Sequence, residues 1–391
     1  MDFWKLFLVA LMPVLKVLLI TAVGTFLALD RFDILRETAR KNLNTIIYFV
    51  FSPTLVCSSL AETITLRSVI VLCFMPVNIL LTFVVGTVLG LLLVKVTRVP
   101  HHLHGLVLGC CAAGNLGNLP LIIVPAVCKE RSSPFGDVNV CYRNALAYAS
   151  LSMALGSIYI WSYAYNLVRI YARKVSNEVK VEDSMVNIPV AATKTDPEDL
   201  STCSTELPIV TANDRSQIEN HVKQFEIQCT MPNEQAKIVG IIIGVVPQFR
   251  KLLVSDSAPL RVIQDSVVML GDASIPAVTL LVGANLVKGL KGLAEQLPLI
   301  VGIIVVRCIA LPAIGVGIVK GAIHFGLIHP DPLYEFLLLL QFALPPAVAM
   351  STITQLFGAG EGECSVIMLA TYSCSAISLT LWCTFFMWLV L

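Results

Sequence analysis

Long apolar runs separated by short polar segments dominate the chain. A helix that spans a bilayer needs about 20 mainly apolar residues, and ten runs reach this length. The first run continues to Leu29 without a small-residue cleavage site, so we expect a retained helix and not a signal peptide. The pattern predicts an all-α integral membrane protein with ten transmembrane helices, near residues 6–29, 43–61, 68–94, 104–128, 144–168, 235–253, 262–287, 296–320, 333–357 and 364–391.

A polar stretch between the fifth and sixth runs divides the chain. Residues 173–234 carry six basic and eleven acidic side chains. Such a segment cannot bury enough apolar surface to offset its ordering entropy. We therefore expect a first five-helix membrane repeat at 1–170, a disordered linker at 171–234 and a second five-helix repeat at 235–391. A small folded domain in the linker is the alternative.

Prolines recur at matching places in the two halves. Pro53 in the second run lies 223 positions before Pro276 in the seventh, and Pro120 in the fourth run lies 225 and 226 positions before Pro345 and Pro346 in the ninth. Because each half holds an odd number of helices, the second half enters the membrane from the opposite face. This arrangement is the inverted-repeat plan of secondary transporters, in which broken helices at corresponding positions mark the binding site. We expect broken crossover helices at the fourth and ninth positions.

The fourth run contains the sequence GNLGNLP at residues 114–120. Proline removes an N–H donor and clashes with the carbonyl one turn back, so Pro120 is expected to break this helix near its midpoint. A half-helix that starts at such a break presents free N–H groups and a partial positive charge, which favour an anion. Asn115 and Asn118 add neutral donors at the same place.

The ninth run repeats this device in the sequence QFALPPAVAMS, where Gln341 precedes Pro345 and Pro346. Two broken helices that cross at mid-membrane direct two positive ends at one point, which suits a carboxylate attached to an apolar body. The predicted site is neutral, because it uses amides and helix ends and neither Lys nor Arg. The alternative is that the prolines only kink the helices and the amides only bond neighbouring helices.

Asp272 and Arg307 are charged residues that lie well inside predicted helices. Asp272, in the sequence LGDASIP, either binds a proton or sodium ion or satisfies backbone groups at the kink beside Pro276. We expect the side chains of both Asp272 and Gln341 to lie within reach of the bound substrate. Arg307 lies in the eighth run, where we expect it to pair with another group or to extend toward the membrane interface.

The composition excludes several classes of protein. The chain is 56% hydrophobic and 14% charged, whereas a soluble domain carries about 25% charged residues. The formal net charge is +1, so nothing indicates a nucleic-acid partner. The sequence contains no nucleophile elbow, phosphate loop, HExxH motif or zinc-type Cys/His spacing. We therefore expect no enzyme, no cofactor and no metal site.

Lys and Arg near the ends of the runs indicate the orientation. Twelve lie on the linker side and nine on the other side, which places the linker in the cytosol and both termini across the membrane from it. Cys128 and Cys141 bracket the loop after the fourth run, which then lies outside the cytosol, where disulfides persist. We expect either a disulfide between these two residues or, equally, two free thiols at helix ends.

Several long motifs resemble a known family. They resemble the plant PIN-LIKES proteins of the auxin efflux carrier superfamily over residues 1–170 and 235–391. The resemblance leaves out the linker. The motifs are FDILRETARKNLNTIIYFVFSPTLVCSSLAETIT, FMPVNILLTFVVG, GCCAAGNLGNLPLIIVPAVC, SPFGD, PLRVIQDSVVMLGDASIP and LQFALPPAVAMSTITQLF.

The resemblance implies a fold similar to that of bile-acid symporters, with a scaffold that supports a homodimer and six further helices that move. It also implies residence in the endoplasmic reticulum membrane and an auxin-like anion as the small-molecule partner. In the related PIN carriers an asparagine at the fourth-helix crossover holds the auxin carboxylate. That asparagine stands seven residues before its proline, whereas Asn115 and Asn118 stand five and two residues before Pro120. The resemblance therefore leaves the choice between them open.

Two classes of function remain. The first is a secondary carrier that moves indole-3-acetic acid or a similar apolar carboxylate by alternating access, coupled to protons or moving net charge. The second is a membrane receptor that holds the hormone without moving it. A carrier of another organic anion is a variant of the first class. Broken helices in both halves favour transport, because a binding protein has no need of a symmetric, two-sided site.

Overall fold

The structure is a computed structural model, and it describes residues 3–29, 31–32, 34–63, 72–130, 133–172, 235–236, 238–254, 258–286, 297–329, 331–357 and 360–391. Apart from its first two residues, the linker predicted at 171–234 lies outside these ranges. Within them every named element is helical, and the only extended pairing is an isolated bridge between Gly114 and Pro346.

Before the linker, most runs form long helices, and the fourth run is divided into the two shorter helices α6 and α7. The named elements are α1 (Phe3–Leu27), α2 (Glu37–Ile46), the π-helical turn η1 (Ile47–Phe51), α3 (Ser52–Thr63), α5 (Phe74–Thr97), the short 3₁₀ turn η2 (His101–Leu103), α6 (His104–Ala112), α7 (Asn118–Lys129), α8 (Val138–Tyr159) and the π-helical turn η3 (Ile160–Ala164).

The elements after the linker are more often interrupted than those before it. The named elements are α11 (Pro247–Leu253), α12 (Arg261–Asp272), α13 (Ser274–Leu286), α14 (Leu297–Val305), the π-helical turn η5 (Val306–Ala310), α15 (Leu311–His324), α16 (Pro332–Ala343), α17 (Ala349–Phe357) and α18 (Glu361–Val390).

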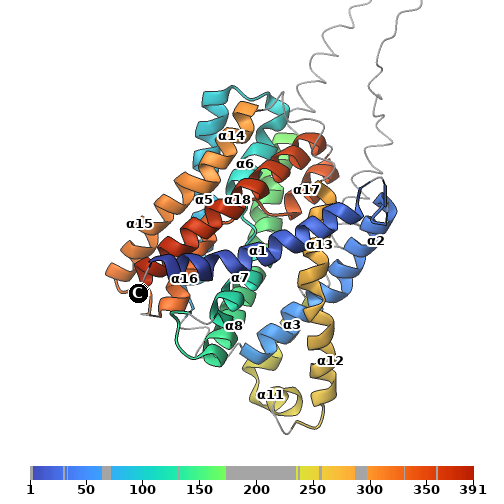
Figure 1. Ribbon diagram of the computed structural model, residues 1–391, viewed down its shortest axis with the longest axis vertical. Coiled ribbons are helices and arrows are strands. Elements are labelled where there is room, and N and C mark those ends of the chain that lie inside the picture. The colour runs from blue at the N-terminus through green and yellow to red at the C-terminus, as the bar shows by residue number, and fades with distance from the viewer. Residues whose placement is uncertain are drawn as a thin grey trace, which may run out of the picture.

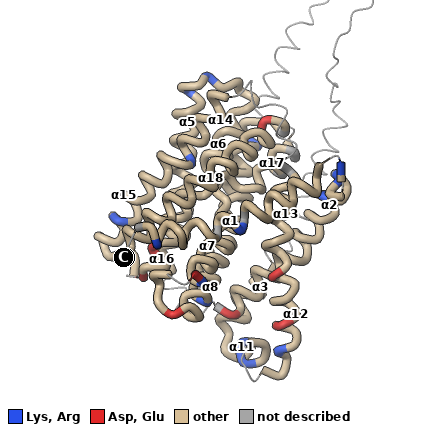
Figure 2. The backbone as a smooth tube through the Cα atoms, in the orientation of Figure 1, with Lys and Arg blue, Asp and Glu red and all other residues tan. Residues whose placement is uncertain are grey.

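Six continuous helices in the described residues are long and apolar enough to cross a membrane. They correspond to the first, second, third, fifth, eighth and tenth predicted runs. Their bounds are Trp4–Leu27, Thr38–Glu62, Phe74–Thr97, Val138–Ala172, Leu297–His324 and Gly362–Val390. Figure 2 shows the charged residues gathered mainly at helix ends and loops, with long uncharged stretches between them, as expected of helices that face lipid.

The remaining four runs are interrupted. The fourth run forms α6 and α7, and the ninth forms α16 and α17, as expected for the crossover helices. The prediction of one helix at 235–253 is wrong: the helix stops at Val246, whose backbone is extended, and α11 starts at Pro247. The cause is the proline, which disfavours helical backbone in the residue before it. The seventh run forms α12 and α13, which join at Ala273.

The helices gather into two groups that meet along α1 and α8. In Figure 1, α2, α3, α12 and α13 lie together on one side, whereas α5, α6, α14 and α15 lie on the other. Helix α1 packs on α13 and α18, and α3 packs on α12 and α8. The largest buried cluster lies mainly in the second group, around α5, α6, α7, α16 and α18. The two interrupted pairs of helices therefore meet inside the protein and not at its lipid-facing surface.

A π-helical turn also interrupts the helix formed by α14 and α15. Pro312 has no N–H for the carbonyl of Cys308, four residues earlier. That carbonyl accepts hydrogen bonds from Trp382 Nε1 (2.7 Å) and Ser378 Oγ (3.3 Å) of α18. The freed backbone group is therefore satisfied by a neighbouring helix, as the membrane interior requires.

Candidate functional site

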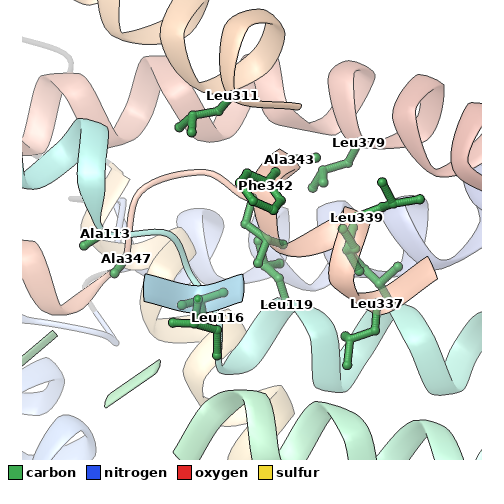
Figure 3. Close-up of a cluster of buried hydrophobic side chains, with 14 of the residues drawn as sticks. Ala113, Leu116, Leu119, Leu311, Leu337, Leu339, Phe342, Ala343, Ala347 and Leu379 are labelled. Atoms are coloured by element: carbon green, nitrogen blue, oxygen red, sulfur yellow. The ribbon is translucent and has the colours of Figure 1, made fainter. Parts of the chain in front are cut away.

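The two extended segments between the half-helices pair with each other. Asn115 N donates to the carbonyl of Pro345 (2.8 Å), and Ala347 N donates to the carbonyl of Ala113 (2.9 Å). Figure 3 shows Ala113 and Ala347 side by side where the segments meet. Non-helical backbone at membrane depth must be satisfied inside the protein. Each break therefore supplies the hydrogen-bond partners that the other break needs.

The second break forms where the prolines predict it. Helix α16 ends at Ala343, and Leu344 is extended with ψ 142° because it precedes Pro345. Neither Pro345 nor Pro346 has an N–H to continue the helix. Helix α17 then starts at Ala349.

The first break does not form where Pro120 predicts it. Helix α6 ends at Ala112, and the break covers the next five residues. Helix α7 starts at Asn118, so Pro120 lies in its first turn, where a missing N–H leaves no intrahelical bond unmade. The prediction that Pro120 breaks the helix is therefore wrong. Gly114, Asn115 and Gly117 lie in the break, and Asn118 is the first residue of α7.

The N-terminal ends of α7 and α17 meet at one cavity of about 200 Å³. The first crossover segment contributes its wall from Asn115 to Asn118, and the second contributes Ala347, Val348 and Ala349. Helices α3 and α8 and the turn η3 close the other side with Ser52, Val56, Met153, Gly156, Ser157 and Ile160. Two helix N-termini, each with a partial positive charge, therefore share one small and mostly apolar space.

The two asparagines have different roles in this geometry. Asn115 is buried, its Nδ2 donates to the Tyr372 hydroxyl (2.8 Å), and its Oδ1 accepts from Asn118 N (3.3 Å). The Tyr372 hydroxyl in turn donates to the carbonyl of Pro346 (3.0 Å). Asn115 therefore ties the two breaks together. The side chain of Asn118 is partly exposed to the cavity and makes no hydrogen bond to any residue that the structure describes.

Gln341 is fully buried and lies in a polar chain beneath the crossover. Its Oε1 accepts from Asn78 Nδ2 (2.8 Å), and its Nε2 donates to Ser152 Oγ (2.9 Å). Ser152 Oγ donates to the carbonyl of Leu116 in the first break (3.2 Å). Gln341 therefore joins α5, α16 and α8 to the crossover, and it does not line the cavity.

Asp272 stands apart from the crossover. It is the last residue of α12, its side chain is exposed, and it does not line the cavity. Two positions later in the chain, the Ser274 hydroxyl lies 3.5 Å from that of Ser52 in the cavity wall. The place of Asp272 within reach of a bound substrate remains a prediction.

Arg307 changes the expected electrostatics. It is 1% exposed, and its Nε donates to the carbonyl of Cys110 near the end of α6 (2.8 Å). It neither reaches the interface nor forms an ion pair with a described residue. The crossover is therefore not the neutral region that the sequence suggested, because a buried guanidinium lies beside it.

A second cavity, of about 90 Å³, meets the crossover at Pro345. Its walls come from α1, α7 and α18, and they include Leu18, Ile123, Tyr372 and Leu379. It is smaller than the first cavity and touches neither asparagine.

Cys128 and Cys141 are joined by a disulfide, with Cα atoms 5.6 Å apart. The bond ties the end of α7 to the start of α8, where Asp137 Oδ1 accepts from Asn139 N and Val140 N and so caps the helix. Among the described residues, no group of three His, Cys, Asp or Glu side chains is placed to hold a metal ion.

Sequence reasoning missed Asn78, Ser152 and Tyr372, which hold the crossover in place. Each is a single polar residue inside an apolar run, and its partner comes from another helix. No local spacing marks such a residue. The only signal is a polar side chain in a membrane segment, which several unrelated positions share.

The chain matches the family of membrane transport proteins over residues 9–383. It is 47% identical to Protein PIN-LIKES 1 of Arabidopsis thaliana over 100% of this chain and 81% of that protein. It is also 47% identical to Protein PIN-LIKES 3 of the same plant, over 99% of this chain and 98% of that protein. This chain belongs to the PIN-LIKES family. An uncharacterized transporter of Schizosaccharomyces pombe is 20% identical over 95% of the chain.

The family membership confirms the resemblance in the sequence motifs. PIN-LIKES proteins belong to the auxin efflux carrier family, so the chain is a multi-pass membrane transport protein and not an enzyme. The match covers both crossover segments and therefore includes the residues that line the cavity between them.

Proposed function

We propose that this PIN-LIKES protein is a secondary carrier of an apolar carboxylate, auxin in the first place, and that the carboxylate binds in the 200 Å³ cavity at the crossover. One observation carries this proposal: the N-termini of α7 and α17 open into the same cavity. Helix N-termini favour anions through free N–H groups and the helix dipole.

The chemistry of the cavity wall supports an acid with an apolar body. Asn118 offers an amide without a described partner, and Ser52 and Ser157 add hydroxyls. Val56, Met153 and Ile160 supply apolar surface for a ring system. Pockets for drug-sized ligands measure about 300–1,000 Å³, so a cavity of about 200 Å³ suits a smaller organic acid such as indole-3-acetic acid.

Movement of the substrate is proposed to follow the inverted-repeat plan. The interrupted pairs α6/α7 and α16/α17 support ten membrane spans arranged as repeats at 1–170 and 235–391. The grouping of α2, α3, α12 and α13 on one side, in contact with the other helices through α1 and α8, supports a scaffold against which the rest rocks. Alternating access then exposes the same cavity first to one side and then to the other.

We also propose the location and assembly that the family resemblance implies. These are the endoplasmic reticulum membrane, a cytosolic linker at 171–234, lumenal termini and a homodimer on the scaffold side. The disulfide between Cys128 and Cys141 supports this orientation, because disulfides persist in an oxidising lumen and not in the cytosol.

Radiolabelled indole-3-acetic acid uptake into proteoliposomes tests the function. Purified full-length protein is reconstituted, and uptake is followed with no gradient, with a proton gradient and with a sodium gradient. Uptake above that of empty liposomes, competed by unlabelled substrate, is the expected result. A dependence on the proton gradient or on membrane potential would define the coupling.

Two outcomes would replace the proposal. Saturable binding without uptake under any gradient would favour a receptor. Uptake of other apolar carboxylates, with no competition by indole-3-acetic acid, would favour a carrier of a different anion.

A further inference from the structure

Arg307 is among the largest fully buried side chains in the protein, at 1% exposure. Only its Nε has a hydrogen-bond partner among the described residues, the carbonyl of Cys110. Its Nη1 and Nη2 atoms, which carry most of the donor capacity of the guanidinium, are buried and have none there.

No negative charge faces this guanidinium from the described residues. The titratable groups around it are Cys110 and Cys111 on α6, Cys308 on its own turn and Tyr372 on α18. Thiols and phenols are ordinarily neutral at physiological pH. The ion pairs that the structure describes join other residues. A buried charge without a partner is costly in a membrane protein and marks a functional site by default.

The guanidinium lies directly against the first crossover segment. A Cβ atom at Gly114 would stand 3.2 Å from Nη1, so a side chain at this position would push the guanidinium away by a few tenths of an ångström. Gly114 pairs with Pro346 of the second segment, and the next residue, Asn115, lines the cavity. One backbone segment therefore separates the positive charge from the proposed ligand.

The surrounding helix holds Arg307 in this position. The residue belongs to the π-helical turn Val306–Ala310, a feature that is frequent at functional sites. The turn is fixed on its far side by Trp382 and Ser378, which bond the carbonyl of Cys308. A helical turn, and not a flexible loop, therefore positions Arg307 beside the crossover.

We infer that Arg307 is the residue that makes the crossover cavity select anions, acting through the Gly114 segment without touching the ligand. This inference rests on the proposed function and adds a fixed positive charge to the two helix ends. In a low-dielectric interior a full charge acts strongly over several ångströms, and salt screens it little. The cavity then prefers a carboxylate to a neutral ligand of the same shape.

The role of Arg307 in anion selection is tested with two ligands that differ in charge and only little in shape. Affinities for indole-3-acetic acid and indole-3-acetamide are measured by calorimetry on purified full-length protein in nanodiscs at pH 7. Four proteins are compared: wild type, Arg307→Lys, Arg307→Gln, and Arg98→Gln as a control for loss of an exposed charge at the end of α5.

Wild type, Arg307→Lys and Arg98→Gln should prefer the acid by roughly tenfold or more, whereas Arg307→Gln should lose about a factor of ten of this preference. Its affinity for the amide should change by less than about threefold. A merely structural arginine would weaken both ligands together and leave their ratio unchanged.

Two results would overturn the inference. The first is a wild-type protein that binds the acid and the amide equally, which needs no variant to fold. The second is an Arg307→Gln variant that keeps the wild-type ratio. Failure of the wild type to bind or move any carboxylate would instead reject the proposed function, so the two failures are distinguishable.

Discussion

Each of the two crossover segments interrupts a helix, but the two segments do so with different residues. In the first, between α6 and α7, two glycines and Asn115 break the helix, and Asn118 begins α7. The second, between α16 and α17, uses Pro345 and Pro346 and carries only apolar side chains in its cavity wall. Proline fixes the backbone angle, whereas glycine and asparagine permit several conformations.

This difference assigns separate roles to the two segments. The second segment is a rigid partner that offers its carbonyls to Asn115 N and Tyr372. The first segment holds the polar side chains and the close contact with Arg307. We expect substitutions that remove buried hydrogen bonds, at Gln341 below the second segment and at Asn115 in the first, to lower stability, and loss of the Asn118 side chain to weaken ligand binding.

The largest effect on stability is expected for Gln341→Ala at the end of α16. The change removes two buried hydrogen bonds, one from Asn78 Nδ2 and one to Ser152 Oγ, and opens a cavity, so the free energy of unfolding should fall by about 2–5 kcal/mol. Thermal unfolding in detergent measures this. Ser162→Ala, which removes an exposed hydroxyl, is the control and should shift stability by less than about 0.5 kcal/mol. An unchanged unfolding temperature for Gln341→Ala would refute the structural role.

The next effect separates the two asparagines of the first segment. Asn118→Ala should weaken binding of indole-3-acetic acid by roughly tenfold to a hundredfold, the value of one hydrogen bond to a charged group. Its unfolding temperature should stay at the wild-type value, because the side chain has no described protein partner.

Asn115→Ala is the matched comparison. It should lower the unfolding temperature, because Tyr372 and Asn118 N lose their partner. If instead Asn115→Ala weakens binding at unchanged stability and Asn118→Ala does nothing, then Asn115 is the ligand residue and the assignment is reversed.

The smallest effect is expected for Pro346→Ala in the second segment. The change keeps the carbonyl that Tyr372 bonds and mainly increases the freedom of the unfolded chain, at a cost of about 0.4–1 kcal/mol. Affinity for indole-3-acetic acid should change by less than about threefold. A large loss of affinity with normal stability would mean that the second segment is not merely a rigid partner.

The sequence predicts the plan of the crossover better than its details. Paired prolines after an apolar run mark the second break correctly, because two successive residues without N–H cannot continue a helix. Pro120 misleads, because proline is equally suited to the first turn of a new helix. The family resemblance, in contrast, is confirmed over nearly the whole chain.

The residues around the site are harder to predict than the site itself. Asn115 and Asn118 line the cavity as a break-forming motif suggests. Gln341 has its polar partners on α5 and α8, and Arg307 meets Cys110 from nearly two hundred positions away. Such contacts depend on how helices pack, which no local pattern encodes.

The pairing of Gly114 with Pro346 has a consequence for how the protein is made. These residues lie about 230 positions apart, and a ribosome adds roughly 5–20 residues per second, so the first break waits roughly 10–50 s for its partner. During that interval its peptide groups have no place in lipid. The newborn first half must therefore stay in a hydrated insertion channel or be shielded by a membrane chaperone until α16 and α17 arrive.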